Sequence, residues 1–494
     1  MIGFKIKDRV AYKKVTDAFK KLNKGASIVD VVSETALPIN TVRETVPKVA
    51  DEYSARLQVT ESGEILYSFP NGFKSKYRGF RAGLRRFSEK ALKWLKIAGK
   101  NIFKVWIMVM LVGYFALFML IALAALLLSM VSNQNSESRS DSRGGGGLFF
   151  TSAILNTIVR IWFYSELVKT VDRGYYGNRA PPKPKGKPLY KAIFSFIFGD
   201  DDPNGDWLSK EKQVVIAHLQ NNRGVISLPE FMILTGFDPQ TAESKITAYC
   251  AEFGGLPEAT EDGTVVYRFD ELLLRADKRD RSFQSSSPIK RLQTFSSNPK
   301  KMNVGFSIIN SVNLLFGSYF LFYSMTLGNA ITSASLEGAS YLYGIAYILA
   351  SMVINNPLLF LLIGLGIVPV IFSFLFWIIP VLRNYFMKKE NEHTKLENLR
   401  KIAYSMIWSN PKEVKAEDIQ APTEECSPKN FHLAQDSVIK EMGSYAMPDV
   451  TINSEGKTVY VFNELDREKT ALKKYRDSIN PENSSLGKVI FDSN

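Results

Sequence analysis

Residues 105–131 read VWIMVMLVGYFALFMLIALAALLLSMV, an apolar run without a single charged side chain. An α-helix rises about 1.5 Å per residue, so this run is long enough to cross a hydrocarbon core of about 30 Å. A helix that is apolar on every side is typical of a membrane span. The run therefore predicts a membrane-spanning helix, and the rest of the chain is organised around it.

A second apolar run, residues 148–168, contains two charged side chains, Arg160 and Glu166. We expect it to span as the return helix of a membrane hairpin (residues 105–168), with an interfacial or re-entrant segment as the alternative. Charge within a span is costly and is by default a hypothesis for a functional site. The two residues are six positions apart and share no helical face, so we expect Glu166 to reach the headgroups and Arg160 to face the bundle or a water-filled gap.

Two more runs of spanning length, residues 303–327 and 357–382, predict a second membrane hairpin. Between them, residues 341–354 are apolar but too short for a span, and we expect a re-entrant or interfacial segment. The alternative, five spans, would place the carboxyl-terminal region on the opposite side of the membrane from the other soluble regions.

Basic residues beside the spans favour four spans, because lysine and arginine are retained in the cytoplasm. Residues 73–104 hold eleven basic residues against one acidic residue, and residues 169–191 hold seven against one. Residues 274–301 hold eight against two, and three basic residues follow residue 382. All four flanks are therefore expected in the cytoplasm. We predict an integral protein of the bacterial inner membrane with both termini cytoplasmic.

Three soluble regions, residues 1–72 (module 1), 200–273 (module 2) and 390–470 (module 3), share a Gly-x-x-x-Tyr-x-Phe signature after a polar turn. This pattern predicts a β-hairpin in each module. The signature residues are Gly63, Tyr67 and Phe69, then Gly263, Tyr267 and Phe269, then Gly456, Tyr460 and Phe462. Tyrosine and phenylalanine two apart in a strand point to one face, so we expect both rings to hold the hairpin onto its own helices.

Helical periodicity precedes each hairpin, for example at Val42, Val46 and Val49 in module 1 and at Ala242, Ile246 and Tyr249 in module 2. Three helices and a two-stranded wing predict a winged-helix-like α+β domain. Module 3 departs from this pattern, since residues 410–429 carry three prolines and five acidic residues where a second helix would lie. The expected fold is mixed: four spans alternating with three winged-helix-like domains, joined by basic linkers (residues 73–104, 169–199 and 274–302) and followed by a tail (residues 471–494).

The charge distribution argues against nucleic acid as a partner, although the pI is near 9.3. The four membrane flanks together carry +25, whereas the whole chain carries +13, so the remainder carries −12. Module 2 has five basic residues against fourteen acidic ones. Phosphate contacts supply nearly all non-specific DNA affinity, and they need basic side chains on the binding face. The basic flanks are instead suited to anionic lipid headgroups.

One basic flank could form a helix in the membrane interface, because its charged residues alternate with apolar ones. We expect lipid headgroup contacts from Arg85, Arg86, Lys90, Lys93 and Lys96. A solvated basic linker is the alternative.

Catalytic and metal-binding motifs are not found in the sequence. It contains no phosphate-binding glycine loop of the Walker type, and its three histidines lie far apart. Its two cysteines, Cys250 and Cys426, have no partners at metal-ligand spacing. We expect no enzymatic activity, no cofactor and no bound metal.

The segment FSFIFGDDDPN (residues 194–204), together with the hairpin EDGTVVYRF (residues 261–269), resembles an uncharacterised family of multi-spanning membrane proteins of bacteria and plastids. The resemblance covers mainly module 2 and implies location and architecture, without an activity. We expect a membrane scaffold or adaptor whose modules bind an as yet unknown protein partner. The alternatives are a membrane-tethered DNA-binding regulator and a transporter or channel component.

Overall fold

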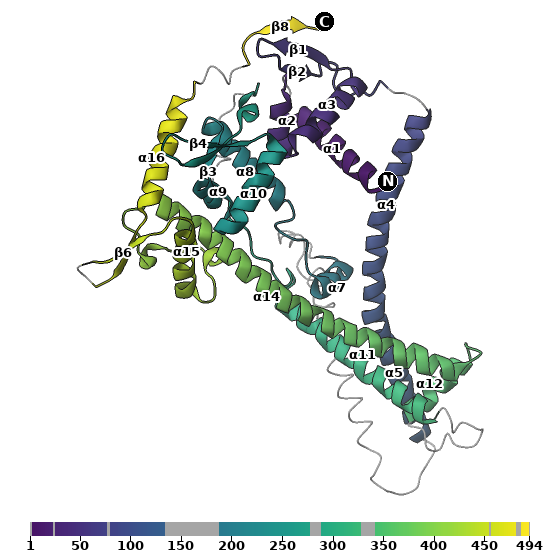
Figure 1. Cartoon of the computed structure of the whole chain (residues 1–494). Coiled ribbons are helices and arrows are strands. Elements are labelled where there is room, and N and C mark those ends of the chain that lie inside the picture. The colour runs from purple at the N-terminus through teal and green to yellow at the C-terminus, as the bar shows by residue number, and fades with distance from the viewer. Residues whose placement is uncertain are drawn as a thin grey trace, which may run out of the picture. The chain divides into compact units, whose positions relative to one another are not determined.

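The computed structural model describes residues 2–22, 25–76, 80–133, 187–276, 288–327, 341–453, 456–480 and 486–493. The chain divides into two compact units (Figure 1). Unit 1 combines Met1–Ser88, Asp201–Gln293 and Lys388–Asn494, and unit 2 combines Glu89–Asp200 and Thr294–Met387. The three modules thus belong to one unit, although they are far apart in the sequence.

Module 1 consists of three helices followed by a hairpin. Its elements are α1 (Ile2–Lys21), α2 (Ile28–Thr35), α3 (Ile39–Glu52), β1 (Arg56–Thr60) and β2 (Ile65–Ser68). A capping box between Ser27 and Asp30 starts α2, satisfying backbone N–H groups that have no helical partner. The side chains expected on one buried helical face, Val42, Val46 and Val49, are 0 % exposed.

Module 2 has the same order of elements with one additional short strand and a 3₁₀ turn. These are α8 (Trp207–Asn221), β3 (Val225–Ser227), α9 (Leu228–Thr235), α10 (Pro239–Phe253), β4 (Leu256–Ala259), β5 (Val265–Arg268) and η2 (Asp270–Leu273). Asp238 caps α10 by accepting a hydrogen bond from the Thr241 N–H at 3.0 Å. The sheet order is β3-β5-β4 with antiparallel pairing throughout.

Module 3 differs from the other two in its second helix. Its elements are the carboxyl-terminal part of α14 (Val368–Ser409), η6 (Ala416–Asp418), η7 (Glu424–Cys426), α15 (Phe431–Tyr445), β6 (Asp449–Ile452) and β7 (Thr458–Val461). The two short 3₁₀ turns, η6 and η7, occupy the place of α2 and α9. The departure expected for residues 410–429 is therefore present, because prolines disfavour a continuous helix there.

One hydrophobic core runs through all three modules of unit 1. Helix α2 packs against α8, and α10 packs against both α3 and α15. Polar contacts also join modules 1 and 2: the Ser27 hydroxyl donates to the Leu274 carbonyl at 3.0 Å, and the Gln220 amide donates to Ser33 Oγ at 2.7 Å. The modules of unit 1 are therefore assembled on one another.

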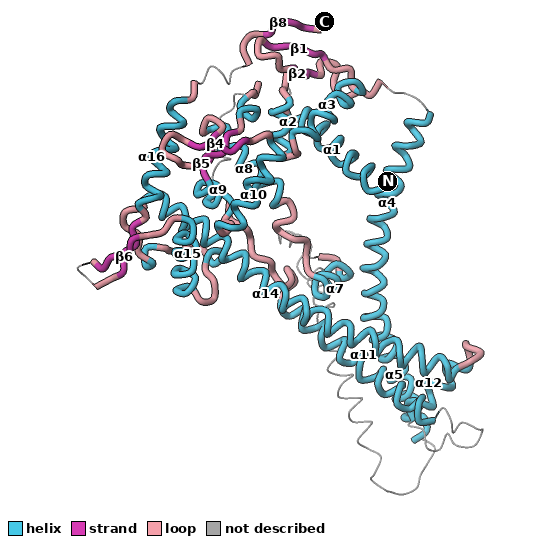
Figure 2. Tube along the Cα trace, viewed as in Figure 1, coloured by secondary structure: helices cyan, strands magenta, loops and turns pink. Residues whose placement is uncertain are grey.

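Two further elements follow the module 3 hairpin, namely α16 (Asn463–Ser478) and β8 (Val489–Asp492). The boundary expected between residues 470 and 471 falls inside α16, so module 3 and the tail are not separated there. Strand β8 joins the sheet of module 1, whose order is β2-β1-β8 (Figure 2).

The described residues of unit 2 are mainly helical. Their elements are α4 (Phe80–Met108) from residue 89 onward, η1 (Val109–Gly113), α5 (Tyr114–Asn133), α7 (Leu189–Phe198), α11 (Lys300–Leu327), α12 (Tyr341–Ser351), α13 (Pro357–Leu359), η5 (Phe360–Ile367) and the first part of α14. The segments η1 and η5 are π-helical. Helix α11 packs closely on η5, because Gly366 leaves room for the Leu321 backbone.

Three described helices are long and apolar enough to cross a membrane: Trp94–Leu128, Lys300–Thr326 and Pro357–Ser409. The most apolar window of each is only 33 % buried by the chain, which leaves apolar side chains exposed. The short segment α12 has 11 residues, fewer than a span needs. The expected second span, residues 148–168, lies outside the described residues. The expected boundary between the basic segment and the first span, at residues 104 and 105, falls inside α4. In the structure, residues 80–104 and the start of the span therefore form one continuous helix.

Candidate functional site: docking faces of the hairpins

The three hairpins turn in the same way. Each signature glycine has a positive φ, which glycine adopts without steric cost: 80° at Gly63, 81° at Gly263 and 75° at Gly456. Each also donates its N–H to the carbonyl of the residue three positions earlier, at 2.9 to 3.0 Å. The shared glycine therefore corresponds to a shared turn geometry.

The signature tyrosines occupy equivalent places in the three modules. Each pairs with an extended residue that precedes the second helix or its 3₁₀ replacement. These pairs are Ala26 with Tyr67, Ile226 with Tyr267 and Val414 with Tyr460. A third extended segment thus lies beside each hairpin.

All six signature rings contact the core of unit 1, to different degrees. Phe269 and Phe462 are at most 1 % exposed and Tyr67 is 6 % exposed, whereas Phe69, Tyr267 and Tyr460 are half-buried. In module 1 the half-buried ring of Phe69 packs edge-on against Phe19 at 5.0 Å between centroids. One ring of each pair is therefore buried, and the other lies at the margin of the core.

The other face of the module 2 sheet is covered by α16. Val225 and Val266 are fully buried against Leu472 of α16, forming a small apolar cluster. Tyr475 of the same helix donates a hydrogen bond to Glu258 on β4. Helix α16 therefore docks on a hairpin that lies about 200 residues earlier in the sequence.

A buried ion cluster fixes this helix in place. Arg476 on α16 contacts both carboxylate oxygens of Glu230, at 2.9 and 2.5 Å, and donates to the Val225 carbonyl at 2.7 Å. His218 Nε2 lies 3.3 Å from Glu230 Oε2. Burial alone would raise the pKa of Glu230, but the hydrogen bonds from His218 and Arg476 outweigh it and lower that pKa.

Another buried carboxyl group, Glu468, belongs to α16 itself, and no cation lies beside it in the described contacts. Glu468 is 8 % exposed, and the Tyr445 hydroxyl lies 3.1 Å from each of its oxygens. Burial raises the pKa of Glu468 to about 7, and the nearby charge of Glu230 acts in the same direction. This carboxyl group can therefore change its charge near neutral pH.

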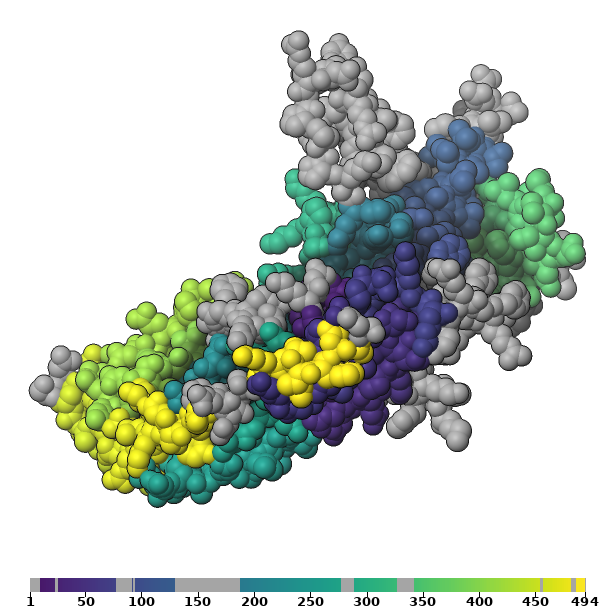
Figure 3. Space-filling view, turned by 90° about the horizontal axis from the view of Figure 1, so that it is seen from above, coloured from purple at the N-terminus to yellow at the C-terminus, as the bar shows by residue number. Residues whose placement is uncertain are grey.

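The module 1 hairpin carries β8 on its free edge. Arg56 on β1 holds Asp492 of β8 with two hydrogen bonds of 2.6 Å, and Gln58 donates to the same carboxylate at 2.8 Å. The Ser493 N–H and the Leu57 carbonyl form a backbone hydrogen bond at 2.9 Å. In Figure 3 the yellow carboxyl-terminal residues lie on the purple surface of module 1. This is strand addition at a sheet edge.

The module 3 hairpin forms a two-stranded sheet among the described residues. Its strand β6 presents Val450 and Ile452, which are 61 % and 75 % exposed, and the preceding Met447 is 82 % exposed. An exposed apolar strand at a sheet edge is a template for pairing with another strand.

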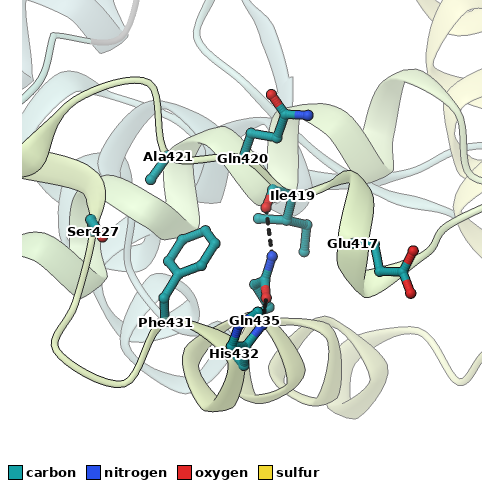
Figure 4. A pocket seen from close by; sticks show the side chains of 8 residues that line it. All are labelled: Glu417, Ile419, Gln420, Ala421, Ser427, Phe431, His432 and Gln435. Atoms are coloured by element: carbon teal, nitrogen blue, oxygen red, sulfur yellow. Dashed lines mark hydrogen bonds between the residues drawn. The ribbon is translucent and has the colours of Figure 1, made fainter.

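A hollow of about 410 Å³ lies in module 3, where the 3₁₀ turns replace a helix (Figure 4). Its wall includes Ile419, Phe431, His432 and Gln435. The Gln435 amide donates to the Ile419 carbonyl at 2.7 Å, and His432 Nδ1 lies 3.2 Å from Gln435 Oε1. Within the described residues there is no group of His, Cys, Asp and Glu that could hold a metal ion.

The basic residues singled out as lipid contacts lie along one helix. Arg85, Arg86, Lys90 and Lys93 lie on α4, and Lys96 on the same helix is exposed. Arg160 and Glu166 lie outside the described residues. The docking of α16 and β8 was missed, although the alternation of charge and apolar residues around Leu465 and Leu472, and the run Val489–Phe491, were signals for a helix and a strand.

Comparison with known proteins finds a distant similarity. An uncharacterized chloroplastic protein of Arabidopsis thaliana is 24 % identical over 268 residues, which cover 53 % of this chain and 48 % of the relative. This chain thus aligns with about half the length of that protein. No family model and no solved structure matches the chain.

Proposed function

We propose that this protein is a membrane scaffold whose winged-helix-like modules bind protein segments through their hairpins. One observation carries the proposal: the hairpin sheets of modules 1 and 2 each hold a segment from the carboxyl-terminal region, a strand in one case and a helix in the other. These contacts within the chain support protein segments as the ligands of the hairpin sheets.

The assembly of unit 1 supports four spans with both termini on one side. Three segments of the chain build a single unit with one core, so all three must lie on the same side of the membrane. Each intervening segment must then cross an even number of times. Residues 294–387 meet this condition with α11 and the α13–α14 region as two spans and α12 as a non-spanning segment. By the same reasoning, residues 89–200 need a second crossing after the first.

The side of the membrane follows from the flanks. The lysine- and arginine-rich segments adjoin the segments of unit 1 in the sequence, so we place unit 1 in the cytoplasm, at a bacterial inner membrane. The basic stretch of α4 would then adjoin anionic headgroups, and its exposed Lys96 would contact them.

Packing of the third helices argues against DNA as the ligand. Helix α10 packs on α3 and α15, so the helices that could enter a DNA groove are engaged with one another. The exposed side chains of α10 include Glu243 and a single lysine, Lys245. Such a surface offers few phosphate contacts.

The module 3 hairpin is the face at which we expect an external partner. Its exposed Val450 and Ile452 would be covered by a strand added to β6, in the way that β8 covers the edge of β1. Ile452→Lys should therefore remove a partner, because a charge on the apolar strand opposes burial. A matched control is Leu433→Lys on α15, since Leu433 is also exposed (67 %) and belongs to the same module.

The test is quantitative co-purification of the full-length chain in mild detergent from its native membrane. We expect at least one protein to be recovered with the parent and with Leu433→Lys but lost with Ile452→Lys. If every co-purifying protein is recovered equally with both variants, the module 3 hairpin is not a docking face.

A transport role is the second candidate, and one observation in unit 2 favours it. Asn310 and Asn313 on α11 are at most 1 % exposed among apolar helices. Their amide nitrogens donate to the Ser373 and Leu111 carbonyls at 3.1 and 2.7 Å, and neither Oδ1 has a hydrogen-bond partner among the described residues. Buried polar groups at membrane depth often mark a pathway. Solute flux in liposomes that is lost on Asn313→Leu would establish this role.

A further inference from the structure

Three asparagine side chains clamp the backbone of residues 288–293, which lead from module 2 toward unit 2. Asn398 accepts from the Lys290 N–H and donates to the Lys290 carbonyl, both at 2.9 Å. Asn391 makes the same pair of bonds with Gln293, also at 2.9 Å. Asn204 does so with Arg291, at 3.0 and 2.7 Å. Six hydrogen bonds therefore hold three residues by their backbone alone.

The spacing of the clamp matches an extended chain. Asn391 and Asn398 lie seven positions apart on α14, which is about 10.5 Å at 1.5 Å per residue. Their partners lie three positions apart, which is about 10 Å for an extended backbone. Arg291 faces the opposite side, where Asn204 meets it. The spacing of the two asparagines along α14 therefore matches the spacing of their partners along an extended segment.

One side chain of the segment, Lys290, lies between a carboxylate and an aromatic ring whose face also contacts Lys401 Nζ at 4.6 Å. Lys290 forms an ion pair with Glu397, and its Nζ lies 5.4 Å from the centre of the Trp207 ring. Glu397 is 6 % exposed, so this cation is held by a buried carboxylate and an aromatic face. In addition, Lys401 donates to the Pro288 carbonyl at 2.9 Å.

The remaining side chains of the segment contribute little burial. Ile289 is 39 % exposed, Arg291 is exposed, and Leu292 is only partly covered. The buried polar groups of this contact are Asn398 and Glu397, both on α14. The recognition therefore depends on an extended backbone and one lysine.

We propose that the groove formed by α14, Asn204 and Trp207 is a binding site for extended peptide segments that carry a lysine, and that residues 288–293 occupy it as an internal ligand. The partner is a protein segment with a lysine at the anchor position and no proline at the three clamped positions, because each clamp needs a backbone N–H. This inference deepens the proposed scaffold function and rests on it only in taking protein segments as partners. The site is separate from the module 3 hairpin.

The first test uses the unmodified full-length chain in detergent and the synthetic peptide Pro-Ile-Lys-Arg-Leu-Gln. Acylation of Lys290 by an amine reagent is followed by mass spectrometry, since its side chain is 18 % exposed while it is paired. We expect excess peptide to accelerate Lys290 acylation severalfold, because the peptide displaces the internal segment. The same peptide with alanine in place of lysine should have no such effect.

The second test uses Lys290→Ala in the full-length chain and the fluorescein-labelled peptide. Without its anchor the internal segment competes less well, so we expect the peptide to bind roughly tenfold tighter than to the parent, and to lose this gain when Asn398→Ala is added. If the Lys290→Ala variant does not fold, the acylation of Lys290 in the unmodified chain is sufficient to test the proposal. Equal Lys290 acylation with and without peptide, or equal affinity for the lysine and alanine peptides, would overturn the proposal.

Discussion

Replacing Arg476 by alanine should release α16 from module 2. The guanidinium is the main partner of buried Glu230, with contacts at 2.9 and 2.5 Å, and only His218 would remain, at 3.3 Å. Removing one member of a buried ion pair typically costs about 3–5 kcal/mol, because the other charge stays buried without compensation. Since His218 remains, we expect about 3 kcal/mol.

Hydrogen–deuterium exchange of α16 amides in the full-length chain measures this effect. A loss of about 3 kcal/mol from the opening free energy accelerates exchange by roughly a hundredfold. Lys474→Ala is the matched control, because Lys474 lies two positions away on the same helix and pairs with the exposed Glu261. Adding Glu230→Gln to the Arg476→Ala variant should restore part of the protection, since it removes the uncompensated charge. If Arg476→Ala exchanges no faster than Lys474→Ala, the ion cluster does not fasten α16.

Three other predictions concern different parts of the molecule. Phe269→Ala should destabilise module 2 by about 3–5 kcal/mol, measured by thermal unfolding, because Phe269 is 1 % exposed and the cavity cannot close fully; an unchanged melting temperature would show that this ring is dispensable. The pKa of Glu468 is raised from 4.5 to about 7, so its contribution to stability is full below about pH 4.5 and is lost as the pH rises through 7. Glu468→Gln should therefore gain up to about 3 kcal/mol over the parent between pH 5 and pH 8, and parallel pH profiles of the two would contradict the assignment. Reporters within residues 132–147 and 328–356 should be found outside the cytoplasm and fusions at both termini inside, whereas an external carboxyl terminus would exclude four spans.

Local patterns predicted the local structure of this chain well. The charge-free run from residue 105 lies in a helix of spanning length, and the three glycine signatures lie in three β-hairpins. These features depend on neighbours in the sequence: hydropathy over one helix, and a turn that requires positive φ at Gly63 or Gly263. The altered second helix of module 3 was also predictable, because proline disrupts the helix of the segment in which it lies.

Contacts between distant segments were not predictable from one sequence. Arg56 and Asp492 are separated by 436 positions, and the local sequence around either residue does not indicate that they are in contact. The asparagine clamp was not predictable for the same reason, since Asn391 and Asn398 of α14 and the distant Asn204 are ordinary polar residues until folding brings them beside residues 290–293. The motif around Asn204 was noticed in the sequence, but its role in holding another backbone became visible only in the structure.

The return of α16 and β8 to earlier modules has a consequence for biogenesis. A ribosome makes module 1 before the apolar regions, yet the strand that completes its sheet is synthesised after both of them. Until then β1 has an open edge and the outer face of β5 is bare, so the nascent chain exposes surfaces that attract chaperones or neighbouring chains. Closure of unit 1 by α16 and β8 therefore depends on segments that are synthesised after both apolar regions.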